Sequence, residues 1–123
     1  MNRSRPINLN LMTIRFPLPA IVSILHRISG VFLFLLIPVA LWLLDFSLTP
    51  EGFDVLHDWQ DSFIAKFMIW GVMAAFLYHM VAGIRHLLSD AHLGSTRQGG
   101  KITAKLVFIV SIILVILVGI WLW

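Results

Sequence analysis

Three apolar runs, each long enough to cross a lipid bilayer, constrain the fold of this chain more than any other feature. They lie at about residues 21–46, 63–88 and 104–123. A helix needs roughly 20 apolar residues to cross the hydrocarbon, and these runs lack the period-two alternation of a barrel strand. The sequence therefore predicts an all-α membrane protein, in which residues 1–123 form a single domain with three transmembrane helices.

The basic residues predict how these helices are oriented. Of the nine lysines and arginines, all except Lys66 lie near the N-terminus or around the second connection, whereas the first connection is acidic. Positive charge near short loops marks the cytoplasmic face. The first twenty residues also lack the continuous apolar segment of a cleavable signal. We therefore expect a multi-pass protein of the bacterial inner membrane, with a cytoplasmic N-terminus and a periplasmic C-terminus.

Composition excludes several classes of function. The chain has no cysteine, so it cannot itself supply a disulfide, a thiolate metal site or the ligands of an iron–sulfur cluster. A soluble basic domain with interleaved aromatic residues, which would indicate nucleic-acid binding, is missing as well. Because little sequence lies outside the three runs, we expect a chain that is not catalytic alone and that functions within a complex.

The segment "SILHRISG" places polar residues in the first predicted span. Ser23, His26, Arg27 and Gly30 have the spacing i, i+3, i+4, i+7, which gathers them on one face of a helix. One interpretation is that Arg27 extends to the lipid headgroups while the other polar groups bond to backbone or water. The other is a polar pocket for an anionic or carbonyl-bearing ligand.

His79 lies deep within the second predicted span, between small residues. Ala75 and Gly83 precede and follow it by four residues, so we expect them to leave space beside the imidazole. The ring could bond to another helix, or its neutral nitrogen could be an axial ligand of haem iron. We expect His26 at a different depth, in which case a second axial histidine would come from another polypeptide.

Two polar residues follow His79 near the cytoplasmic interface. Arg85 and His86 could pair with haem propionates, or they could anchor the helix among lipid headgroups. Position alone does not separate these two interpretations.

The motifs "RPINLNL", "SILHRISG" and "YHMVAGIRHLLSD" together resemble those of the cytochrome b membrane-anchor subunit of bacterial succinate dehydrogenase, respiratory complex II. The resemblance extends over almost the whole chain. It implies that the three helices form half of a heterodimeric anchor bundle. It also implies the partners: a second hydrophobic anchor subunit, an iron–sulfur subunit, a flavoprotein subunit, the lipid membrane and ubiquinone.

The resemblance further implies roles for particular residues. His79 would be an axial ligand of haem b, with the other axial histidine supplied by the second anchor subunit. Ser23 and Arg27 would line the ubiquinone pocket, and His26, Arg27 and His86 would be candidate contacts of the haem propionates. Electrons from succinate oxidation would then reach ubiquinone at the cytoplasmic side of the membrane.

Two other functions remain open at this stage. A haem-free structural anchor could dock a soluble redox enzyme on the membrane. A small transporter or channel subunit is a weaker alternative, because the sequence has no internal repeat and no carboxylate in the middle of a predicted span.

Overall fold

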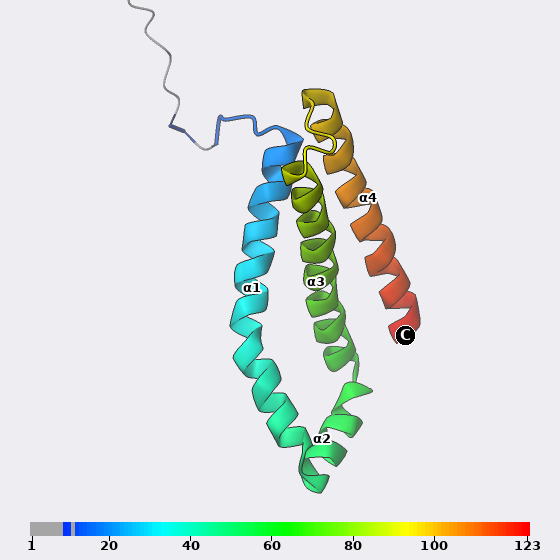
Figure 1. Cartoon of the computed structure of the whole chain (residues 1–123). Helices are drawn as coiled ribbons and strands as arrows, with labels where there is room; N and C mark the ends of the chain where they lie inside the picture. The colour runs from blue at the N-terminus through cyan, green and yellow to red at the C-terminus, as the bar shows by residue number, and fades with distance from the viewer. Residues whose placement is uncertain (1–8, 11) are drawn as a thin grey trace, which may run out of the picture.

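The computed structural model describes residues 9–10 and 12–123 as four helices joined by short connections (Figure 1). In chain order they are α1 (Leu18–Ser47), α2 (Pro50–Gln60), α3 (Phe63–Asp90) and α4 (Arg97–Leu122). The first two arginines and most of the motif "RPINLNL" lie outside the described residues.

The prediction of three membrane-spanning helices is confirmed. α1, α3 and α4 have 30, 28 and 26 residues and are apolar enough to cross a membrane. At 1.5 Å per residue each measures about 40 Å or more, which exceeds the roughly 30 Å of hydrocarbon. α1 continues through Pro38 without a break, as a transmembrane helix can when its surroundings satisfy the freed backbone.

α4 begins earlier than its sequence suggests. The glycines and basic residues before residue 104 predict a loop, yet the helix starts at Arg97. Thr96 caps it, because its hydroxyl accepts a hydrogen bond of 2.9 Å from the backbone N–H of Gly99. A cap of this kind satisfies a donor that the first helical turn leaves unpaired. Gly99 and Gly100 therefore belong to the helix rather than to the connection.

The first connection contains a helix that we did not predict. In α2, Thr49 is the N-cap and accepts a hydrogen bond of 3.1 Å from Gly52, while Pro50 occupies the first helical position. A threonine cap followed by proline is a recognised helix start, so the signal was present in the sequence. α2 lies at the end of the molecule opposite to the α3–α4 connection (Figure 1).

α3 packs against both other long helices. At the end that we expect to be cytoplasmic, the buried side chains of Val22, Ala82, Ala104 and Val107 bring the three helices together. The Tyr78 hydroxyl donates a hydrogen bond of 2.9 Å to the backbone carbonyl of Val22. Hydrogen bonds between membrane helices contribute on average about 0.6 kcal/mol each.

Near the C-terminal end of α4, the indole of Trp70 links α3 to α4 through a hydrogen bond. Trp70 Nε1 donates a hydrogen bond of 2.9 Å to the carbonyl of Val115. Gly119 makes this approach possible, because a Cβ atom there would lie 3.1 Å from Trp70 Nε1. α1 does not share this contact; between it and α3 there is an apolar cavity of about 270 Å³, which Trp59 of α2 and Met68 of α3 help to line.

Candidate functional site

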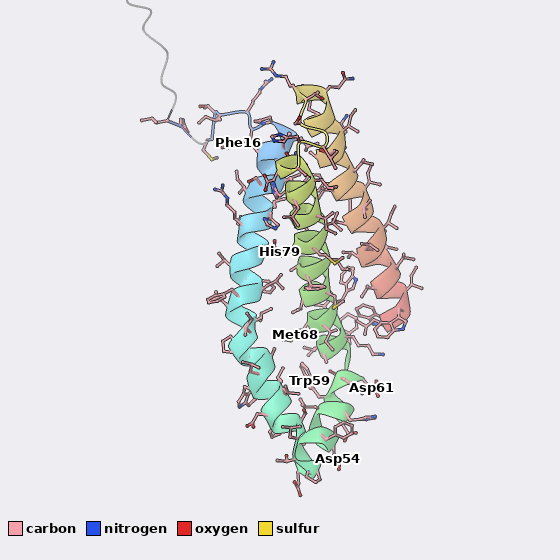
Figure 2. The ribbon with its side chains drawn as sticks, in the orientation of Figure 1. Phe16, Asp54, Trp59, Asp61, Met68 and His79 are labelled. Carbon is pink, nitrogen blue, oxygen red and sulfur yellow. The ribbon has the colours of Figure 1, made fainter. Side chains whose placement is uncertain are left out.

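His79 occupies the side of α3 that faces α1, in the half of the bundle where the helices pack most closely (Figure 2). Its Nδ1 atom lies 3.1 Å from the backbone carbonyl oxygen of His26 and 3.0 Å from the hydroxyl of Ser29. The same hydroxyl donates a hydrogen bond of 2.8 Å to the carbonyl of His26. One edge of the imidazole is therefore fixed by α1.

These contacts determine which nitrogen of His79 carries the proton. A carbonyl oxygen only accepts hydrogen bonds, so Nδ1 must be the protonated nitrogen that donates to His26. Ser29 uses its own proton on the same carbonyl, which leaves its oxygen free to accept from Nδ1. In a neutral imidazole the other nitrogen then carries the lone pair. Within the described chain, no hydrogen bond engages His79 Nε2.

Ser29 is a residue that the sequence analysis missed. It is only 8% exposed and follows His26 by three residues, which places it on the inner face of α1. The motif "SILHRISG" contains Ser29, but Ser29 lies outside the polar spacing that includes Ser23 and Arg27. A small hydroxyl on the buried face was the available signal.

The space beside His79 comes from α1 rather than from its own helix. A Cβ atom at Gly30 would lie 3.0 Å from His79 Cε1. Gly83, which we expected to flank His79, instead faces His26, whose Nε2 would lie 3.3 Å from a Cβ at that position. Gly30 is therefore the small residue that admits the imidazole.

The expectation that His26 and His79 lie at different depths is wrong. Their rings stack at a centroid distance of 4.2 Å with an interplanar angle of 10°. The reason is that α1 begins at Leu18, which puts His26 deeper in the helix than its predicted start implied. Rings stacked face to face cannot ligate opposite sides of one iron, so His26 and His79 are not placed as a pair of axial ligands.

The ring of His86 lies beside that of His26. The centroids of the two rings are 5.0 Å apart and their planes are inclined by 55°. Its Nε2 is buried and has no hydrogen-bond partner among the described residues. A buried polar nitrogen without a partner costs free energy, so this position suits a further acceptor such as a carboxylate.

Ser23 and Arg27 lie on the more open side of the same helix. Ser23 is half-buried and its hydroxyl makes no hydrogen bond within the described residues, while Arg27 is exposed. Arg27 lines an open groove of about 430 Å³ on α1 whose other walls are apolar, including Ile28 and Phe32. The motif thus has two sides: Ser29 and Gly30 contact His79, whereas Arg27 lines the open groove.

Arg85 is separated from the histidines. Its Nε donates a hydrogen bond of 3.2 Å to the Thr103 hydroxyl, and its Nη2 one of 3.3 Å to the Gly100 carbonyl. Both acceptors belong to α4, on the side of α3 away from His79. Although Arg85 and His86 are adjacent in sequence, they therefore serve different parts of the structure.

Residues able to chelate a bare metal ion do not gather here. The part of the chain that the structure describes has no group of three or more His, Cys, Asp or Glu side chains placed to hold one. Iron in a porphyrin receives its in-plane ligands from the macrocycle and needs only an axial nitrogen from the protein. The single free Nε2 of His79 meets that requirement.

Comparison with known proteins gives a consistent result. The sequence pattern of the "Succinate dehydrogenase/Fumarate reductase transmembrane subunit" family matches residues 1–118. The chain is 42% identical to the succinate dehydrogenase cytochrome b556 subunit of Coxiella burnetii over the full length of both chains. It is 33% identical to the protein of the same name from Paracoccus denitrificans, over 93% of this chain and 88% of that one.

Another relative has a similar degree of likeness over a shorter segment. The chain is 38% identical to the succinate dehydrogenase cytochrome b560 subunit of Porphyra purpurea, over 73% of this chain and 74% of the relative.

Replacing Gly30 by alanine tests the close contact between α1 and His79. Alanine is intrinsically more favourable than glycine within a helix by about 1 kcal/mol, but its Cβ would press on His79 Cε1 at 3.0 Å. The ring cannot easily retreat, because Ser29 and His26 hold its edge and face. We expect Gly30→Ala to lower the thermal stability of the purified protein.

Gly71→Ala is the matched control. Gly71, like Gly30, lies in the middle of a long helix, here α3, and a Cβ atom there would meet nothing within 4 Å. That variant should be unchanged or slightly stabilised. Equal melting temperatures for the two variants would contradict the close packing of His79 against Gly30.

Proposed function

This chain belongs to the succinate dehydrogenase/fumarate reductase transmembrane subunit family, and from that premise we propose that His79 is an axial ligand of haem b and that Ser23 and Arg27 bind ubiquinone. The chain is a cytochrome b membrane-anchor subunit of succinate dehydrogenase, a multi-pass protein of the inner membrane. Its assignment as a subunit explains why it has little mass outside the membrane.

The observation that carries the proposal is the free Nε2 of His79. A neutral imidazole nitrogen whose partner nitrogen is hydrogen-bonded is the usual form of a histidine that ligates a metal. When bound, a b-type haem would supply a one-electron redox centre. The names of the relatives, which are cytochrome b556 and b560 subunits, support haem as the group that His79 binds.

Ser29 and the His26 carbonyl have a supporting role in this proposal. They hold the proton at Nδ1 of His79 and fix the direction of the ring. Partners of this kind select the tautomer and raise the basicity of a ligating nitrogen. The protein thereby presents Nε2 in a single orientation before any ligand arrives.

His26, Arg27 and His86 are the candidate contacts of the haem propionates. The unpaired Nε2 of His86 and the guanidinium of Arg27 can each donate hydrogen bonds to a carboxylate. The ring of His26 stacks on that of His79 and also contacts that of His86. These residues lie towards the end of the bundle that positive charge marks as cytoplasmic, where a propionate could reach polar surroundings.

Ubiquinone reduction requires a donor and a positive charge near the quinone oxygens. Ser23 has a hydroxyl without a hydrogen-bond partner in the described structure, and it can donate to a quinone carbonyl. The guanidinium of Arg27 can stabilise negative charge that develops on that oxygen. Its apolar groove suits the hydrocarbon part of such a substrate.

The remaining groups come from partner subunits in this proposal. A second hydrophobic anchor subunit supplies the other axial histidine, and the iron–sulfur and flavoprotein subunits deliver electrons from succinate. The alternative is a haem-free anchor that only docks the soluble subunits. The fixed Nδ1 of His79 favours the first proposal, because a purely structural histidine gains nothing from a free Nε2.

Substitution of His79 by alanine is the direct test of the haem site. We expect the assembled complex to show the spectrum of a reducible low-spin b-type haem, and His79→Ala to remove that spectrum or convert it to a five-coordinate form. His57→Ala, on the exposed surface of α2, is the control and should leave the spectrum intact. An unaltered spectrum in His79→Ala would rule out this residue as the ligand.

Removing the Ser29 hydroxyl should change the electronic character of the ligand without removing it. Ser29→Ala leaves only the His26 carbonyl to accept from Nδ1, so His79 becomes a weaker donor to iron. We expect the haem midpoint potential to rise, on the order of tens of millivolts, at unchanged haem content. Ser29→Thr retains the hydroxyl and should restore the wild-type potential.

Ser111→Ala is the matched control for Ser29. Ser111 is 5% exposed on α4, and its hydroxyl has no partner among the described residues. Its loss removes the same atoms from an equally buried site. If both alanine variants shifted the potential equally, Ser29 would have no special role towards His79.

Substitutions at the quinone site should separate two activities. Ser23→Ala and Arg27→Leu are expected to lower ubiquinone reduction by about tenfold or more each, because loss of a hydrogen bond to a charged group costs about 1.5–3 kcal/mol. Succinate oxidation by an artificial soluble acceptor should persist. A parallel loss of both activities would mean that the variants impair assembly rather than quinone binding.

A further inference from the structure

Arg85 is a cation near the end of α3 that the proposed haem and quinone sites do not use. It lies five residues before the end of α3, about 8 Å along the helix, at the end that we expect to be cytoplasmic. Its two hydrogen bonds go to neutral acceptors on α4. No carboxylate of the described chain forms an ion pair with it, and a guanidinium has more N–H donors than the two in use.

The acidic residues of the sequence cannot supply the missing counter-ion. Asp90 is the single carboxylate at this end of the chain, and the other five lie between residues 45 and 61. Asp90 is exposed and does not line the cavity in which Arg85 lies. Arg85 therefore has N–H donors available for an anion from outside this chain.

The surroundings of Arg85 indicate what that anion is attached to. α3 and α4 enclose an open groove of about 310 Å³. Its polar residues are Arg85, Ser89 and Thr103, and its apolar walls continue beyond Arg85 and Thr103 as far as Val81 and Val110. The seven residues from Thr103 to Val110 measure about 10 Å, roughly two thirds of the depth of one hydrocarbon leaflet.

We propose that this groove binds an anionic phospholipid of the cytoplasmic leaflet, with its phosphate at Arg85 and one acyl chain along the apolar walls. Phosphate is the anion available at this depth in a bilayer, and a guanidinium pairs with it through parallel N–H donors. Thr103 and Gly100 hold the guanidinium in place, so little side-chain entropy is lost on binding. The groove lies on the opposite side of α3 from His79, so this inference is independent of the proposed haem site.

The experiment counts phospholipids bound to the assembled complex by native mass spectrometry, with phosphatidylglycerol and, separately, phosphatidylcholine as the added lipid. We expect one phosphatidylglycerol per copy of this chain to be retained in preference to phosphatidylcholine. Arg85→Gln should weaken its binding by about fivefold, the effect of one basic residue near a lipid surface.

Lys105→Gln is the matched control. Lys105 is two residues from Thr103 and so lies on roughly the opposite face of α4; it does not line the groove. Its loss removes an equal charge from the same end of the bundle and should leave the bound phosphatidylglycerol unchanged. Equal weakening by both variants would show general attraction to a basic surface and would overturn the proposal.

A second variant leaves Arg85 intact. Val110→Phe fills the apolar end of the groove, and we expect it to weaken retention of phosphatidylglycerol. Retention at the wild-type level in this variant would place the lipid elsewhere. If the wild-type complex retained no phosphatidylglycerol that depends on Arg85, the groove would be covered by a protein partner, and the proposal would be wrong.

Discussion

The structure depends on one contact, in which the imidazole of His79 donates from Nδ1 to the backbone carbonyl of His26. That carbonyl belongs to α1 and the imidazole to α3, so the bond joins two helices at a depth where water is scarce. Hydrophobic burial contributes little to helix association in lipid, and polar contacts of this kind have a larger share. Ser29 completes the contact, since it bonds to both groups, and Gly30 provides the space for it.

The sequence predicted the three long helices because length and hydropathy depend on local composition alone. It did not predict α2, although Thr49 and Pro50 are a cap and a first-turn residue, because the acidic residues of that segment suggested a loop. The start of α4 was missed for a related reason: Gly99 and Gly100 are poor helix formers, and the cap at Thr96 outweighs them. A helix cap acts through a single hydrogen bond, and the composition of a segment does not reveal whether that bond forms.

The sequence indicated the histidines and Arg27 of the candidate site, but it indicated neither Ser29 nor the arrangement of these residues. Polar residues in an apolar span, such as His79 and Arg27, are conspicuous in a sequence because they are costly there. Which of them meet depends on how α1 and α3 are rotated against each other. The stacking of His26 on His79 follows from that rotation, which the spacing of residues within one helix does not reveal. The divergence of Arg85 from His86, in contrast, follows from the spacing itself, because consecutive residues of a helix point about 100° apart.

The two interfaces of α3 differ in what they require. Its contact with α4 has a hydrogen bond near each end, from Arg85 to Thr103 and from Trp70 to Val115. Neither bond involves His79 or His26. Its contact with α1 is hydrogen-bonded at Tyr78 and His79, and an apolar cavity follows towards Trp59. A change at His79 should therefore loosen α1 from α3 and leave the α3–α4 hairpin paired, because the hydrogen bonds of that hairpin do not pass through the histidine.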